Sequence, residues 1–292
     1  MSIPFYHVDV FSPTPLSGNG LTVFTDAGAF TDEFMQRITQ EMRQFESIFL
    51  QRLNDFKFKA RVFTCEEELD FAGHPILGAA SVVHDVYFPD HHTCEWEFQL
   101  NKKTVLVRTQ KEGSRYASVM NQGIPEFGYT LSEQEAREIL SMMNLEMDDM
   151  YPGLMPCVVS TGLAYLILPL KGNGIKARIR IEDVSAILDR FGAKFIGTLE
   201  IPALTIRTWD NAGKVEDVAT GSLAGPCGAL LVKQGFKKAD EPFFLNQGAN
   251  IGRPSKLDIT VKGSENHLTE VWVGGSVCKV GHGFIEQDLF PH

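Results

Sequence analysis

Two helical segments that lack a polar face constrain the fold of this chain more than any other feature. Residues 75–86 are almost entirely Ala, Leu, Ile and Val, and residues 222–234 have an almost wholly apolar middle. A helix that is apolar all round has to be buried on every side. Most other segments alternate apolar and polar residues, which is the pattern of strands. The sequence therefore predicts an α+β protein in which strands surround each of two buried helices.

A weak internal repeat predicts that the chain has two similar halves. The segments 61–63 (RVF) and 207–209 (RTW) lie 146 positions apart, and Gly73 and Gly221, which each precede an apolar helix, lie 148 positions apart. Both offsets are close to half of the 292 residues, a length that suits about two domains. We therefore expect two pseudo-equivalent halves, an N-terminal half at 1–122 that the C-terminal tail rejoins, and a C-terminal half at 123–292.

Other elements follow from capping signals and alternation. Residues 31–42 are predicted to form a helix with Thr31 as its N-cap, and residues 131–144 a second one with Ser132 and Glu135 at capping-box spacing. The strands predicted from alternation lie at 5–11, 21–24, 49–50, 57–63, 93–108, 114–120, 157–168, 202–208, 257–262 and 269–280.

Charge and cysteine content exclude several classes of function. The chain carries 27 basic and 37 acidic residues, so its net charge of −10 argues against nucleic acid or an anionic membrane as a partner. The start of the chain lacks a basic region, and prolines interrupt the charge-free stretch 150–170, so we expect no signal peptide and no membrane span. The five cysteines are odd in number and have no CxxC spacing, which favours a reducing cytoplasm without disulfides or structural zinc.

The segment FAGHPILGAA at 71–80 is the first candidate site. Pro75 suits the first position of a helix, where its missing N–H group does no harm. The N-terminus of a buried helix leaves backbone N–H groups without partners, and together with the helix dipole these groups form an anion site. His74 would stand at the mouth of that site; the alternative is a tight turn in which His74 only caps the helix.

The segment VEDVATGSLAG at 215–225 is the second candidate site. Thr220 or Ser222 can cap the helix, Gly221 lets a ligand approach the backbone closely, and Asp217 lies just upstream. Two helix N-termini in equivalent positions predict a cleft shared by the two halves, in which a carboxylate ligand is bound.

The segment QFESIFL at 44–50 places one acidic residue, Glu46, among apolar neighbours. Apolar surroundings disfavour the charged form of a carboxyl, which suits it to proton transfer near neutral pH. The alternative is an exposed loop glutamate. The sequence contains no GxGxxG motif, no Walker A loop and no GxSxG elbow, and we expect no nucleotide, flavin or metal.

These motifs together resemble the PhzF-like family, which comprises the phenazine-biosynthesis isomerase and its many relatives. The resemblance covers nearly the whole chain and is carried most specifically by GHP-x-LG (73–78) followed by ED-x-ATGS (216–222). The further matching segments are HVDVF with SGNG, ESIFL, ARVFT, EEELDFAGHPILG, Gln247-Gly248, Arg253-Pro254-Ser255 and Val273–Ser276.

The resemblance implies a diaminopimelate-epimerase-like fold: two similar α+β halves, each with a β-barrel-like sheet around a central helix, with the active site between them, in proteins that are commonly homodimers. It implies that Glu46 moves a proton on a small substrate without a cofactor, and that His74 and Asp217 assist by orienting it. The residues implied to bind the substrate, largely its carboxylate, are Gly73, Gly221, Ser222 and Asn19.

Several positions differ from the motifs of related enzymes, and these differences argue against some reactions and substrates. The similar epimerases and proline racemases use two cysteines, and Ala72 and Thr220 occupy those two places here. A racemase of that kind needs both thiols. The departures from the family's own pattern, which argue against the phenazine substrate itself, are Cys65, Val218, Gly20 and Phe45.

The leading hypothesis is therefore a cytoplasmic, cofactor-independent isomerase, a homodimer that acts on a small carboxylate. Two alternatives stay open at this point. One is a protein that binds a carboxylate but has lost the chemistry, and the other is a cysteine-independent racemase, epimerase or dehydratase with Asp217 as its second base.

Overall fold

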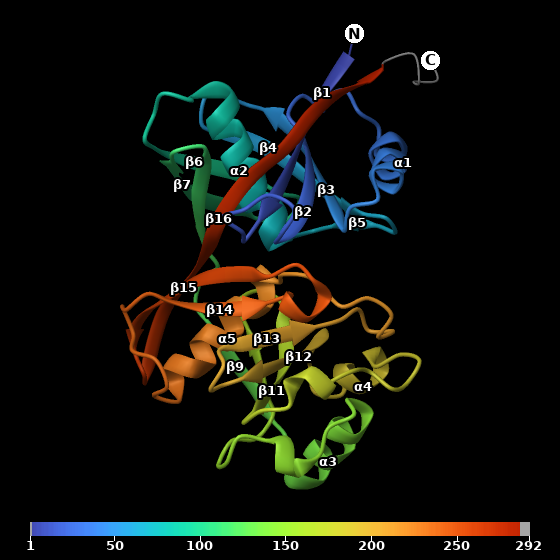
Figure 1. Cartoon of the computed structure of the whole chain (residues 1–292), viewed down its shortest axis with the longest axis vertical. Coiled ribbons are helices and arrows are strands. Elements are labelled where there is room, and N and C mark those ends of the chain that lie inside the picture. Colours follow the sequence, from blue (N-terminus) through green and yellow to red (C-terminus); the bar gives the residue numbers. More distant parts are fainter. Residues whose placement is uncertain (1, 287–292) are drawn as a thin grey trace. The chain divides into compact units, whose positions relative to one another are not determined.

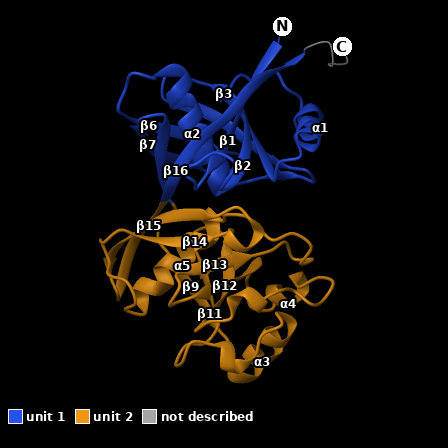
Figure 2. Cartoon of the chain, in the orientation of Figure 1, with its two compact units in different colours: residues 1–121, 274–292 blue, residues 122–273 orange. Residues whose placement is uncertain are grey.

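The computed structural model describes residues 2–286, which form two compact units (Figure 2). Unit 1 comprises the described residues up to Asn121 and those from Gly274 onwards, and unit 2 comprises Gln122–Val273. The chain passes back into unit 1 within one long strand, β16 (His267–Glu286). The sequence predicts a C-terminal half at 123–292 whose tail rejoins the N-terminal half. In the structure, residues 274–286 of that predicted half belong to unit 1.

Unit 1 contains two helices and eight strands besides its share of β16. These elements are β1 (Ser2–Val10), β2 (Asn19–Phe24), α1 (Asp32–Met42), β3 (Glu46–Arg52), β4 (Lys57–Thr64), β5 (Glu68–Leu69), α2 (Gly73–Tyr87), β6 (Thr93–Gln99), β7 (Thr104–Glu112) and β8 (Arg115–Asn121). The strands pair in the order β1-β2-β3-β4-β6-β7-β8-β16, and β1 also pairs with β16, so the pairing returns to its start.

Helix α2 is buried among these strands, as its apolar sequence predicts. Every residue from Gly73 to His84 is buried, and the helix contacts β1, β2, β3, β6, β7 and β8 (Figure 1). It begins at Gly73, two residues before Pro75, so the proline lies in the first turn rather than at its first position. Among residues 2–286, no helix is both long and apolar enough to cross a membrane.

Helix α1 covers a different part of unit 1. The Thr31 side chain accepts a hydrogen bond from the Phe34 N–H group, which confirms the predicted N-cap. Met35 and Ile38 on its buried side join a core cluster with Phe24, Phe49 and Phe63. The helix ends at Met42, and β3 begins four residues later at Glu46.

Unit 2 contains the remaining elements. They are β9 (Glu126–Thr130), α3 (Glu133–Met142), η1 (Met147–Asp149), β10 (Cys157–Ser160), β11 (Ala164–Leu170), η2 (Gly174–Lys176), α4 (Ser185–Asp189), β12 (Phe195–Glu200), β13 (Thr205–Thr208), α5 (Gly221–Lys233), β14 (Phe243–Gln247), η3 (Ala249–Ile251) and β15 (Ser255–Ser264). The strands pair in the order β16-β15-β14-β13-β12-β11-β10-β9. Helix α5 is buried and contacts β10, β11, β13 and β15, and the capping box of Ser132 and Glu135 is present.

The two units repeat one strand pattern. In unit 1, β2 pairs with β3 in parallel and β3 with β4 antiparallel; in unit 2, β11 pairs with β12 in parallel and β12 with β13 antiparallel. The third strand of each set carries an arginine, Arg61 or Arg207, and the next long helix is the buried one. Mixed strand directions with few helices confirm the predicted α+β class.

Replacement of Gly274 by alanine is expected to lower the free energy of unfolding by about 1–3 kcal/mol, because the new methyl group overpacks a backbone contact. A Cβ atom there would lie 2.9 Å from Val119 Cα and closer still to the Ser118 carbonyl oxygen. Gly281 lies in the same strand and has open space beside it, so Gly281→Ala is the matched control. Urea unfolding of both variants measures the difference, and equal stabilities would contradict the close approach.

Candidate functional site

Glu46 is the first residue of β3, and strand pairing fixes it from both sides. It lies opposite Leu21 of the parallel strand β2 and opposite Thr64 of the antiparallel strand β4. Its side chain is only 13% exposed. The exposed loop glutamate that the sequence left open is therefore not what the structure contains.

His74 brings an imidazole to this carboxyl. It is the second residue of α2, its side chain is 8% exposed, and its Nδ1 atom lies 3.2 Å from Glu46 Oε2. Burial lowers the pKa of His74 to about 3, although a hydrogen bond to the backbone of Gly20 opposes the shift. The imidazole is therefore neutral at pH 7, and the contact with Glu46 is not a pair of opposite charges.

The second ring nitrogen of His74 is the notable feature of this group. Its Nε2 atom is buried and has no hydrogen-bond partner among the described residues. Buried polar atoms normally have a partner, so such an atom suits a ligand. Asn19 is buried at the start of β2, two residues before the partner of Glu46. Unit 1 thus brings Glu46, His74 and Gly73 together and places Asn19 on the neighbouring strand.

Asp217 forms the corresponding group in unit 2. Its Oδ2 atom accepts a hydrogen bond from Thr220 Oγ1 at 2.5 Å. Its backbone N–H group donates to the Thr208 carbonyl at 3.0 Å, and its own carbonyl accepts from Gln247 Nε2 at 2.9 Å. The aspartate is therefore held at three atoms by three different segments.

The caps predicted for α5 are not formed in the way that the sequence suggests. Thr220 does stand at the N-cap, but its side chain makes no capping hydrogen bond because its hydroxyl donates to Asp217. Ser222 lies inside the first turn, where its Oγ atom is 2.8 Å from the Tyr165 hydroxyl.

Both buried helices begin without a side-chain cap. The N-cap residues are Ala72 for α2 and Thr220 for α5, and neither helix has an acidic residue in its first turn. Helix N–H groups that lack such partners attract anions. A carboxylate-binding role for Gly73, Gly221 and Ser222 stays a prediction, with which uncapped helix ends are compatible.

The two groups are not chemically equivalent. Glu46 begins the middle strand of the repeated pattern in unit 1, and Phe195 begins it in unit 2. His74 follows the first glycine of α2, and Ser222 follows that of α5. The buried carboxyl–imidazole pair therefore has no counterpart in the described part of unit 2. Among residues 2–286, no three His, Cys, Asp or Glu side chains are grouped to hold a metal ion.

The cysteines do not offer a pair of reactive thiols. Cys65 is exposed, whereas Cys94, Cys227 and Cys278 are buried. Burial raises the pKa of Cys157 to about 11 and that of Cys227 well above its usual value. The absence of a two-thiol mechanism stays a prediction from the sequence, in which Ala72 and Thr220 occupy the two cysteine places.

We expect Ellman's reagent to react rapidly with one thiol per native chain, because only Cys65 is exposed among the five cysteines. Cys65→Ser should remove that rapid phase, and unfolding in urea should reveal the other four thiols. A second rapid thiol in native Cys65→Ser would contradict the prediction.

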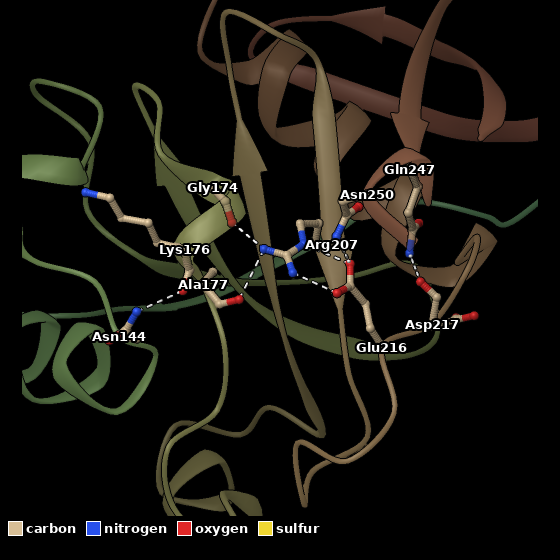
Figure 3. Close-up of polar contacts among 9 residues, drawn as sticks. All are labelled: Asn144, Gly174, Lys176, Ala177, Arg207, Glu216, Asp217, Gln247 and Asn250. Carbon is tan, nitrogen blue, oxygen red and sulfur yellow. Dashed lines mark hydrogen bonds and ion pairs between the residues drawn. The ribbon is translucent and has the colours of Figure 1, made fainter. Parts of the chain in front are cut away.

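Sequence reasoning missed two arginine–carboxylate pairs, one of them buried and the other half-buried. In unit 2, Arg207 Nε and Nη2 donate to Glu216 at 2.8 and 2.7 Å (Figure 3). In unit 1, Arg61 Nε and Nη2 donate to Glu68 at 2.8 and 2.6 Å. The repeat of RVF and RTW marked both arginines in the sequence, but nothing in it identified their partners. Each pair lies just ahead of a buried helix.

Comparison with known proteins identifies relatives of this chain. The family model of phenazine biosynthesis-like proteins matches residues 8–283. The trans-2,3-dihydro-3-hydroxyanthranilate isomerase of Pseudomonas fluorescens is 32% identical over 95% of this chain and 97% of its own length. A structure titled a predicted epimerase from Pseudomonas aeruginosa is 42% identical, with a TM-score of 0.91 over 99% of this chain and 100% of the other.

A more distant structure shows the breadth of the fold. A probable proline racemase from Agrobacterium radiobacter is 10% identical, with a TM-score of 0.63 over 99% of this chain and 94% of the other, and this likeness concerns the fold alone. Several curated relatives are named isomerases, in agreement with the enzyme class that the sequence predicts. A family match across nearly the whole chain, together with these relatives, shows that the chain belongs to the phenazine biosynthesis-like (PhzF) protein family.

Proposed function

We propose that this protein is a cofactor-independent isomerase that moves a proton between two carbon atoms of a small carboxylate, with Glu46 as the acid/base. The observation that carries the proposal is the contact of 3.2 Å between Glu46 Oε2 and the neutral imidazole of His74. A general acid/base has to take up a proton at one atom and release it at another. A buried carboxyl beside an uncharged partner suits both steps.

The proton balance of this reaction is simple. The Glu46 carboxylate removes a proton from one carbon, the substrate's double bond shifts, and the carboxylic acid then returns a proton to a second carbon. No net proton, electron or group is gained, which is why no cofactor is required. His74 would orient the substrate through its buried Nε2 atom, and Asp217 would orient it as the family resemblance implies.

The substrate class follows from the helix ends and from the named relatives. The uncapped N-termini of α2 and α5 favour a carboxylate. A relative at 32% identity is named for trans-2,3-dihydro-3-hydroxyanthranilate, an unsaturated cyclic carboxylate. We infer an unsaturated carboxylate of comparable size. We also infer that the strands of each unit form a β-barrel-like sheet around its central helix, which in unit 1 is supported by the return of the pairing from β16 to β1.

Deuterium incorporation tests the proposed reaction. The wild-type protein is incubated in D₂O with trans-2,3-dihydro-3-hydroxyanthranilate and a panel of unsaturated and cyclic carboxylates, and the products are followed by mass and proton spectra. Isomerisation or deuterium uptake by one compound is the expected result. Thermal stabilisation by a carboxylate without any conversion would contradict the isomerase and favour a binding protein.

A further inference from the structure

Arg207 is a buried cation in unit 2 whose guanidinium donates hydrogen bonds to a carboxylate and to two backbone carbonyls. Its side chain is 9% exposed, and its partner Glu216 is 12% exposed. Besides the two bonds to Glu216, its Nη1 atom donates to the Gly174 carbonyl and, at 3.1 Å, to the Ala177 carbonyl (Figure 3). The guanidinium therefore joins three parts of the chain: β13, the η2 turn and the segment that precedes Asp217.

Glu216 is held on its other side by a second turn. Its Oε1 atom accepts a hydrogen bond from Asn250 Nδ2 at 3.0 Å, and Asn250 belongs to η3. Burial by itself would raise the pKa of Glu216, but the hydrogen bonds from Arg207 and Asn250 outweigh it and keep the pKa below its usual value. Glu216 is thus a charged group in a fixed position, and Asp217 is its immediate neighbour.

The turn that provides Asn250 also holds Asp217. Gln247 is buried; its Nε2 atom donates to the Asp217 carbonyl and to Thr220 Oγ1, both at 2.9 Å, and its Oε1 atom accepts from the Thr220 N–H group. Gly248 adopts a φ of +77°, and a Cβ atom there would lie 2.6 Å from the Val218 carbonyl oxygen. The backbone of this turn therefore packs directly against the segment 216–220.

We propose that Arg207 is a positioning residue for Asp217, which it holds through Glu216 against the turn at 247–250. Hydrogen bonds hold the segment 216–220 from two sides. Arg207, which also bonds to carbonyls in and after η2, binds Glu216, and the turn 247–250 binds Glu216 through Asn250 and Asp217 through Gln247 (Figure 3). The part of the proposal that concerns turnover depends on the proposed function. The part that concerns the placement of Asp217 does not.

Stability alone does not account for such a pair. A buried ion pair is often no more stabilising than apolar side chains of similar volume. Its two-pronged geometry, by contrast, fixes the direction of both side chains. Unit 1 repeats the device in the pair of Arg61 with Glu68, which lies five residues ahead of Gly73, just as Glu216 lies five residues ahead of Gly221.

Three variants separate positioning from stability. Arg207→Met leaves Glu216 buried without its cation, and we expect its melting temperature to fall by about 5–15 °C. The double variant Arg207→Met/Glu216→Leu removes both charges and should recover much of that fall. Arg207→Lys keeps the charge without the two-pronged contact, and it provides the test if the double variant does not fold. Arg108→Met, which breaks an exposed pair with Glu95, is the matched control.

Amide hydrogen exchange of residues 215–220, followed by mass spectrometry, decides the structural part without any substrate. In the double variant and in Arg207→Lys we expect exchange at the Asp217 amide to quicken about tenfold or more, while exchange in residues 57–64 stays at the wild-type rate. Wild-type exchange at Asp217 in a double variant whose stability has recovered would overturn the proposal.

Turnover of the substrate identified by deuterium uptake tests whether the placement of Asp217 by Arg207 matters for the reaction. Misplacement by about 1 Å can reduce a rate by about 100-fold. We expect the double variant to lose about 10- to 100-fold in kcat and Arg108→Met to lose nothing. Full turnover in the double variant would overturn the role of Arg207. If the wild-type protein converts no substrate, it is the proposed function that fails, and the exchange result still decides whether Arg207 positions Asp217.

Discussion

Replacement of Glu46 by glutamine is expected to reduce turnover by about 10²–10⁴-fold, the range that general acid/base catalysis typically contributes. Glutamine keeps the shape of the side chain and its place at the start of β3, but it cannot take up and release a proton at neutral pH. The contact with His74 Nδ1, 3.2 Å away in the wild-type protein, is one that an amide oxygen can retain. Binding of the substrate should therefore persist while its conversion stops.

The measurement compares kcat with ligand-induced thermal stabilisation in the same preparation. Glu66→Gln is the matched control, because Glu66 is an exposed glutamate in the same unit as Glu46. We expect Glu66→Gln to behave as the wild type, and Glu46→Gln to retain the thermal shift without the activity. Full activity in Glu46→Gln would remove Glu46 from the mechanism, and loss of the thermal shift as well would indicate a role in binding.

The buried helices could be predicted closely because their composition is unusual. The predicted segments 75–86 and 222–234 correspond to helices at 73–87 and 221–233. Strands were harder to predict wherever alternation fails. β12 is buried along most of its length on both faces, so it lacks the alternation that marks a strand with one exposed face. β6 and β7 form an antiparallel pair that was predicted as one strand, 93–108, because the alternation continues across their turn.

The site could be predicted as residues but not as contacts. Glu46 and His74 each stood out in the sequence, yet their contact depends on the register that sets Glu46 opposite Leu21. The arginine pairs escaped prediction for a related reason. Arg61 and Glu68 are seven residues apart, and Arg207 and Glu216 are nine, because the connecting segments differ in length. The distance in sequence between each arginine and its partner therefore differs between the two units, and a search for a repeated spacing does not find the pairs.

We expect His74 to make a large contribution to the pH dependence of the free energy of unfolding. Its pKa is about 3 in the folded protein and near 6.5 when unfolded. Between these values the unfolded chain binds a proton that the folded protein does not, so stability rises with pH across this window. As pH falls below 6.5, the free energy of unfolding should decrease by about 1.4 kcal/mol per pH unit from this group alone, or about 2 kcal/mol by pH 5.

His74→Asn should remove this contribution, so its stability should change less steeply between pH 7 and pH 5 than that of the wild type. The slope is compared rather than the stability itself, because the substitution also loses packing. His84, whose pKa burial also lowers, contributes equally to both proteins. His267→Asn, at an exposed position, is the matched control, and the comparison is repeated in Glu46→Gln because that carboxyl contacts the imidazole. Equal slopes in wild type and His74→Asn would mean that His74 takes up its proton over the same pH range in the folded and the unfolded protein. The imidazole would then be charged below about pH 6.5, and its contact with Glu46 would be an ion pair there.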